Sequence, residues 1–127
     1  MSQIGYITIG ARDVEAAMPF YDAVFGALGG KRHFFSGGWA GYGAAEGPAN
    51  IFVCPPFEGE ARAGNGIMVA LNAPSKEAVG AAHEAGLAAG GTDEGQPGPR
   101  PADSTTFYGA YLRDPTGNKL CVFHGSV

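Results

Sequence analysis

The chain has 127 residues, a net charge of −4 and a hydrophobic content of 45%, so we expect residues 1–127 to form a single domain with one core. Its eight Lys and Arg residues are scattered without forming a basic stripe, which argues against nucleic acid as a partner. No apolar run approaches the ~20 residues of a membrane helix, and no charged segment followed by a hydrophobic one opens the chain, so we expect a cytoplasmic protein without a membrane partner.

The first half of the chain predicts a strand, a helix and three further strands. Residues 2–9 are rich in Ile, Tyr and Thr, as strands are. Asp13 is placed to cap a helix that runs to about Phe25. Pro19 lies inside this helix, where it removes an amide donor, so we expect a kink or an irregular first turn. Glycine-containing turns then separate strands at about 31–36, 38–44 and 49–54.

The second half repeats this order after a Pro- and Gly-containing linker. A strand at about 67–71 leads to a helix capped by Ser75. Residues 93–104 contain three prolines and predict a long loop, which either lies on the surface or covers a site. Residues 107–113 and 119–124 predict a hairpin, because the segment from Asp114 to Asn118 supplies proline and glycine at its turn.

The two halves align with a shift of about sixty residues, which indicates an internal repeat. Tyr6 falls on Met68 and Asp13 on Ser75, while Tyr42 and Phe52 fall on Tyr111 and Cys121. The alternative is a chance alignment of short apolar strands. The repeat predicts two similar modules, at about 1–55 and 66–127.

The cysteines and histidines give no catalytic motif of their own. Cys54 and Cys121 lack the spacing of a zinc motif, and we expect reduced, buried thiols rather than a disulfide. His83 is predicted to lie on the solvated face of the second helix. His33 and His124 lie at strand ends, where they either line a pocket or face solvent. Strand alternation places His124 on the opposite face from Cys121.

Several motifs together resemble the vicinal oxygen chelate superfamily, which contains glyoxalases, bleomycin-resistance proteins and extradiol dioxygenases. The residues that carry the resemblance are Ile7 to Gly10 with Asp13, Phe20 to Asp22 with Gly26 to Gly29, Gly64 to Gly66, Pro97 to Arg100, and Tyr111 to Lys119. The resemblance implies an α+β fold in which two βαβββ modules form a curved mixed-sheet cup. It also implies that a homodimer completes the cup.

Catalytic members of this superfamily hold a divalent metal with His, Gln or Glu side chains inside the cup. The resemblance places those four positions at Tyr6, Phe52, Met68 and Cys121. A phenol titrates near ~10, a thioether is a soft donor and phenylalanine has no lone pair. We therefore expect no metal and no other cofactor.

The predicted lining of the cup is aromatic and apolar, with few polar groups to orient a ligand. The predicted ligand-binding residues are Tyr6, Trp39, Phe52, Met68, Arg100, Tyr108 and Cys121. The alternative is that many of these side chains only pack a core. Three functions remain open, and no catalytic residue is assigned. They are a metal-free small-molecule binding protein, a glyoxalase-like lyase or isomerase that uses Tyr6, Cys121 and His124, and a dimeric scaffold without a ligand.

Overall fold

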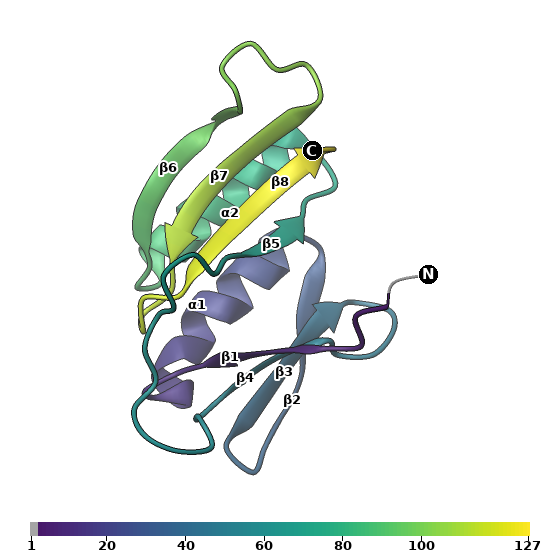
Figure 1. Cartoon of the computed structure of the whole chain (residues 1–127). Helices are drawn as coiled ribbons and strands as arrows, with labels where there is room; N and C mark the ends of the chain where they lie inside the picture. The colour runs from purple at the N-terminus through teal and green to yellow at the C-terminus, as the bar shows by residue number, and fades with distance from the viewer. Residues whose placement is uncertain (1–2) are drawn as a thin grey trace.

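The computed structural model describes residues 3–127 and contains two similar modules (Figure 1). The first module consists of β1 (Ile7–Gly10), α1 (Val14–Ala27), β2 (Gly30–Ser36), β3 (Trp39–Ala44) and β4 (Ile51–Cys54). The second consists of β5 (Val69–Asn72), α2 (Lys76–Ala88), β6 (Thr92–Pro99), β7 (Phe107–Arg113) and β8 (Lys119–Gly125). The predicted α+β class with two βαβββ units is confirmed. The first strand is shorter than the predicted 2–9, and residues 1–2 lie outside the described part.

Each module forms one four-stranded mixed sheet with the same order of strands. The orders are β1-β4-β3-β2 and β5-β8-β7-β6, and in each sheet the first strand pairs in parallel with the last. Thr8 pairs with Phe52 in one sheet, and Ala70 pairs with Cys121 in the other. The register therefore confirms the predicted equivalence of Phe52 and Cys121.

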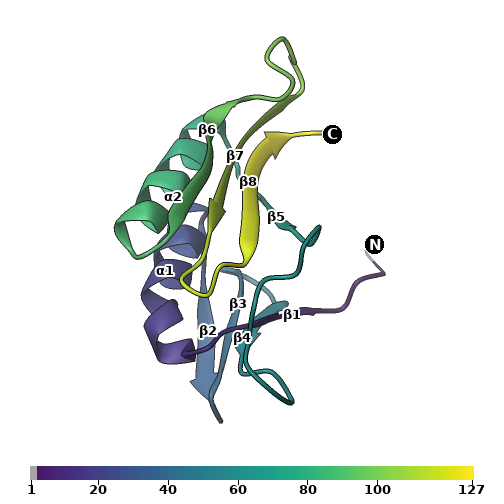
Figure 2. The same cartoon turned by 60° about the vertical axis from the view of Figure 1, so that its left-hand side comes forward.

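The two sheets lie on the same side of the two helices, which pack against each other (Figure 2). The core lies between sheets and helices, because alternate strand residues such as Ile51, Val53, Leu120 and Val122 are buried there. The opposite face of each sheet is open, and the sheets lie side by side, with edge strands β1 and β5 adjacent (Figure 1). One chain thus forms two open sheets and not a closed cup.

Both helices begin where the sequence predicts. The side chain of Asp13 accepts a hydrogen bond from the Ala16 amide, and Ser75 accepts one from the Ala78 amide. Each cap satisfies an amide that has no partner inside its helix. Helix α1 continues through Pro19 to Ala27.

The prediction of a loop over residues 93–104 was wrong for its first part. Residues Thr92–Pro99 form β6, which pairs with β7 on one side only. An edge strand tolerates Pro97 and Pro99, since their missing amides do not interrupt a central ladder. The register of β6 shifts twice around Gly95, which explains why no alternating pattern marks it. Only the segment from Arg100 to Thr106 remains irregular.

The prediction that His83 is solvated was also wrong. His83 is 3% exposed, and its Nε2 lies 2.9 Å from Oδ1 of Asp93. His83 shares a helix face with Val79, Ala82 and Gly86, all of which are buried. This spacing is visible in the sequence and would have placed His83 correctly.

The alignment of Tyr42 with Tyr111 was wrong by one residue. Tyr42 faces the helices and is fully buried, and its hydroxyl donates to Asp22. Cys121 pairs with Tyr111, whereas Phe52 pairs with Gly41. The structural counterpart of Tyr111 is therefore Gly41, and a shift of one residue along a strand reverses the face of the sheet.

Candidate functional site

Four aromatic rings gather on the open face of the first sheet. Phe52 is at their centre, with ring centroids 5.0 Å from Tyr6, 5.9 Å from Phe34 and 5.9 Å from Trp39. Ile51 and Val53 on either side of Phe52 point to the core, so strand alternation directs Phe52 to the open face. Tyr6 is 62% exposed and Trp39 is 38% exposed. These rings therefore form an accessible surface, which we call the aromatic face.

The backbone beneath the aromatic face is shaped for one of these rings. A Cβ atom at Gly41 would collide with the ring of Phe34, which lies directly over this glycine. Gly41 pairs with Phe34 on one side and with Phe52 on the other. The absence of a side chain at this position lets the Phe34 ring pack closely over the backbone of Gly41.

The open face of the second sheet has a different character. Tyr111 pairs across the strands with Cys121. The guanidinium of Arg100 lies 5.4 Å from the Tyr111 ring centroid, and the ammonium of Lys119 lies 5.5 Å from it. We call the surface around Tyr111, Cys121, Arg100 and Lys119 the cationic face.

Burial makes Cys121 a poor nucleophile and a poor metal ligand. The side chain is 1% exposed, and burial raises the pKa of the thiol, although the Tyr111 hydroxyl, Arg100 and Lys119 act in the opposite direction. Burial also raises the pKa of Tyr111. Both groups are therefore protonated at neutral pH, and the thiolate that nucleophilic attack or metal binding requires is scarce.

The four positions that the resemblance assigns to a metal do not fit a hard divalent ion. Phe52 has no donor atom, Met68 offers a thioether, Tyr6 offers a phenol and Cys121 is a buried thiol. Ions of this kind prefer carboxylate, imidazole or carbonyl donors. Within residues 3–127, no group of three or more His, Cys, Asp and Glu side chains is placed to share one ion.

The remaining predicted ligand-binding residues do not all lie together. Met68 immediately precedes β5 and is 44% exposed, and it borders a shallow hollow with Lys119 and Arg113. Tyr108 is on the helix side of β7, where it packs against the core and the Lys76 ammonium lies 5.5 Å from its ring. The structure therefore places Tyr108 on the opposite side of the second sheet from Cys121, while Tyr6, Phe52 and Trp39 lie on the first sheet.

The residues proposed for a metal-independent lyase do not converge. Strand β8 runs without a register shift from Lys119 to Gly125, so Cys121 and His124 point to opposite faces, as the sequence predicts. The Nδ1 atom of His124 lies 3.0 Å from the carbonyl oxygen of Ala73. His124 instead borders a second hollow, of about 320 Å³, beside Tyr108 and Lys76.

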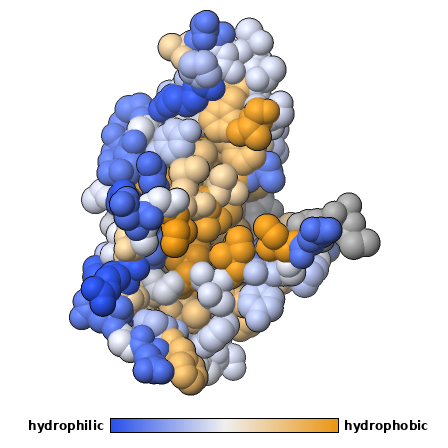
Figure 3. Space-filling model, viewed as in Figure 1, coloured by the Kyte–Doolittle hydropathy of each residue, from blue (hydrophilic) through white to orange (hydrophobic). Residues whose placement is uncertain are grey.

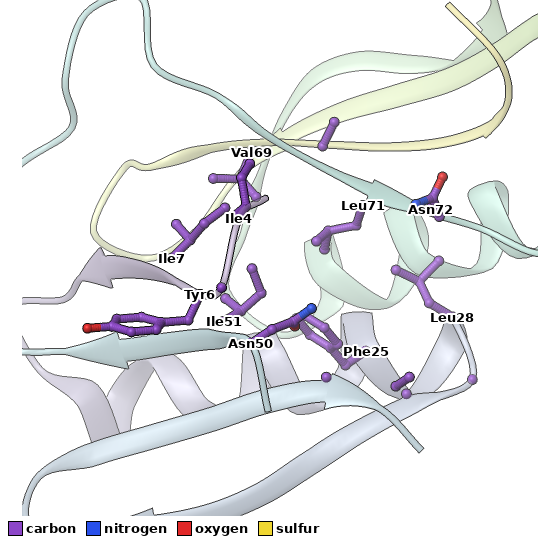
Figure 4. Close-up of a pocket in the computed structure, with 16 residues that line it drawn as sticks. Ile4, Tyr6, Ile7, Phe25, Leu28, Asn50, Ile51, Val69, Leu71 and Asn72 are labelled. Carbon is purple, nitrogen blue, oxygen red and sulfur yellow. The ribbon is translucent and has the colours of Figure 1, made fainter. Parts of the chain in front are cut away.

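A groove of about 580 Å³ lies between the two modules, where edge strands β1 and β5 approach each other (Figure 4). Its apolar side chains include Ile7, Ile51, Val69, Leu71 and Leu28. Tyr6 borders this groove and also belongs to the aromatic face. In the space-filling view, apolar residues form a band across the middle of the molecule, where the modules meet (Figure 3).

The sequence profile of the glyoxalase/bleomycin resistance protein/dioxygenase superfamily matches residues 3–122. The chain belongs to this superfamily. The resemblance read from the sequence is thereby confirmed. No curated protein matches the chain significantly.

Solved structures of other superfamily members agree with this fold. A glyoxalase/bleomycin resistance protein from Albidiferax ferrireducens T118 is 35% identical, with a TM-score of 0.86 over 98% of this chain and 100% of the other. A glyoxalase-related enzyme from Fulvimarina pelagi is 21% identical, with a TM-score of 0.75 over 98% and 89%. A glyoxalase/bleomycin resistance protein/dioxygenase family enzyme from Burkholderia phytofirmans PsJN is 22% identical, with a TM-score of 0.70 over 98% and 100%. At these lower identities the likeness supports the fold alone.

No helix in the described part of the chain combines the length and the apolar character that crossing a bilayer requires.

Proposed function

We propose that this superfamily member is a metal-free binding protein for a small, planar and largely apolar molecule, and that it works as a cytoplasmic homodimer. The observation that carries the proposal is the aromatic face. Four rings lie on the outer side of a sheet instead of in the core, and Tyr6 and Trp39 remain accessible. Exposed apolar patches of this kind on a small protein mark binding surfaces.

A ligand that contacts both faces needs two copies of the chain. Trp39 on β3 and Tyr111 on β7 are separated by four paired strand spacings and by the gap between β1 and β5. At about 4.8 Å per spacing the paired strands alone account for about 19 Å when measured along the sheets, so the two faces of one chain lie well apart. We propose that the aromatic face of one copy lies opposite the cationic face of its partner, and that each ligand lies between them.

The exposed apolar side chains support this arrangement. Ile4, Tyr6, Ile67 and Met68 are 67%, 62%, 68% and 44% exposed. These residues precede the edge strands β1 and β5. A two-fold axis would bring the same surface of both copies together and cover it, because such an interface is self-complementary. We also propose that residues 1–127 act as one domain in each copy.

The proposal is tested with N-phenyl-1-naphthylamine, a neutral aromatic probe whose fluorescence rises in an apolar site. The Trp39→Ala variant should bind it about tenfold more weakly, because stacking on an aromatic ring and the apolar contact area are both lost. The melting temperature should change by less than about 3 °C, because Trp39 is partly exposed and lies outside the core.

Phe57→Ala is the matched control, since Phe57 is an aromatic residue in the linker and is 100% exposed. This variant should bind the probe as the unchanged protein does. Sedimentation should give twice the 13.0 kDa chain mass. An absence of probe binding by the unchanged dimer would favour the scaffold function. Equal affinity of the Trp39→Ala variant and the unchanged protein would show that the aromatic face is not part of the binding site.

A further inference from the structure

Two cations on the cationic face have no acidic partner among residues 3–127. Within the described part of the chain, Arg100 donates hydrogen bonds only to backbone carbonyl oxygens, of Gln96 at 2.5 Å and of Pro99 at 3.2 Å. Lys119 forms no ion pair with any residue from 3 to 127. Arg113, at the end of the same sheet, is by contrast paired with Glu94 at 3.3 Å.

The position of Arg100 is fixed by its surroundings. A Cβ atom at Gly95 would lie 3.3 Å from Nη2 of Arg100 and 2.9 Å from the Tyr111 ring. A Cβ atom at Gly98 would lie 3.1 Å from Nη1. Two glycines of β6 therefore leave the space that the guanidinium occupies. Together with the two carbonyl bonds and the Tyr111 ring, this space orders the guanidinium before any ligand arrives.

The cationic face also contrasts with the overall charge. The chain carries a net charge of −4, yet both unpaired cations lie within 5.5 Å of one ring. Two like charges at such a site repel each other. An anion bound between them offsets this repulsion, because it is attracted to both cations. Arg100 retains N–H groups beyond its two carbonyl bonds, so it can donate to an oxyanion.

We propose that Arg100 and Lys119 form an anion subsite beside Tyr111, so that the ligand carries a carboxylate, sulfonate or phosphate group on its planar apolar body. The inference rests on the proposed function, because it assigns the aromatic face to the body of the ligand and the cationic face of the partner copy to its anionic group. It goes further by stating the charge of the ligand and the two residues that select for it.

The test compares two fluorescent probes that differ in one group. 1-Anilinonaphthalene-8-sulfonate has the ring system of N-phenyl-1-naphthylamine together with a sulfonate. The dimeric protein should bind the sulfonate probe at least tenfold more tightly than the neutral one, as charge-assisted hydrogen bonds imply. The double variant Arg100→Gln, Lys119→Gln should lose this preference while its affinity for the neutral probe stays within about twofold.

Lys76→Gln is the matched control for the charge. Lys76 also lies over a tyrosine, at 5.5 Å from the Tyr108 ring, but on the helix side of the second sheet. The control should keep the tenfold preference. Equal affinity for the two probes, or a preference that persists in the double variant, would overturn the anion subsite while the proposed function stands. Failure of both probes to bind would overturn the proposed function itself, and with it this inference.

Discussion

One buried carboxylate, Asp114, adds to the packing of the two helices in joining the modules. The cost of removing its hydrogen bond to the first module can be estimated from the structure. Tyr21 on α1 donates a hydrogen bond to Oδ2 of Asp114 at 2.6 Å, and the two side chains are 0% and 3% exposed. Oδ1 accepts from the backbone amides of Thr116, Gly117 and Asn118 at 2.8 to 3.0 Å. Asp114 thus joins the first helix to the turn that precedes Lys119.

The Tyr21→Phe variant removes only the hydroxyl group. The phenol is a donor throughout the accessible pH range, because burial and the adjacent Asp114 raise the pKa of Tyr21. Without it, Oδ2 keeps a single donor, the Asn118 side chain at 3.0 Å. Loss of a hydrogen bond to a buried charged group costs about 2 kcal/mol. For a domain of this size, that corresponds to a fall of about 8 °C in melting temperature.

Urea denaturation followed by far-ultraviolet circular dichroism measures this loss. The control is Tyr108→Phe, because the structure gives the Tyr108 hydroxyl no hydrogen bond within the described residues, and its free energy of unfolding should change by less than about 0.5 kcal/mol. An equal, small effect of both variants would show that Asp114 does not depend on Tyr21 and would refute the reasoning.

Three further predictions concern Asp93, the two cysteines and Gly95. The hydrogen bonds that Asp93 accepts from the Gly95 amide and from His83 lower the pKa of its carboxyl below the ordinary 3.8. The stabilisation by this carboxylate is therefore present above that value and is lost as the pH falls below it. Asp93→Asn should make the melting temperature depend less on pH between pH 5 and pH 2, and an unchanged pH dependence would show that Asp93 does not contribute to it. Burial raises the pKa of Cys54 and Cys121, so Ellman's reagent at pH 7.5 should label the native thiols at least tenfold more slowly than the urea-unfolded thiols, and equal rates would contradict their burial. Gly95→Val should displace Arg100 and lower the affinity for 1-anilinonaphthalene-8-sulfonate about tenfold, while the neutral probe still binds. Unchanged affinity for the sulfonate probe would show that the position of Arg100 does not affect binding.

Local chemistry in the sequence is sufficient to predict much of the fold. Asp13 and Ser75 can be predicted as helix caps, because each is a short polar residue followed by apolar residues that recur about every 3.6 positions. The hairpin of β7 and β8 is found from its turn, where Gly117 has a positive φ of 109°. These features depend on neighbours within a few residues, and such neighbours are visible in the chain.

Features that depend on distant partners are harder to predict. Strand β6 is stabilised by β7 despite two prolines and two register shifts, and no local pattern encodes that pairing. Tyr108 and Tyr111 are three residues apart and lie on opposite faces of β7. The predicted ligand-binding residues include Tyr108 and omit Tyr111, because the sequence does not show which face of the sheet each tyrosine occupies. Lys119, which we propose as part of the anion subsite, is not predicted from the sequence, because its position over the Tyr111 ring depends on pairing across the hairpin.

Complementation between two variants that each bind the sulfonate probe weakly tests the central claim that each ligand lies between two copies. Trp39→Ala alters only the aromatic face, and the double variant Arg100→Gln, Lys119→Gln alters only the cationic face. Chains of both kinds, co-expressed in equal amounts, form mixed dimers in which one of the two sites has both faces unchanged. The account predicts that tight binding of 1-anilinonaphthalene-8-sulfonate returns to about one quarter of the unchanged capacity, from random pairing in a two-fold dimer. If each site lies within a single chain, every site in the mixture carries a defect, and the absence of any recovery would contradict the account.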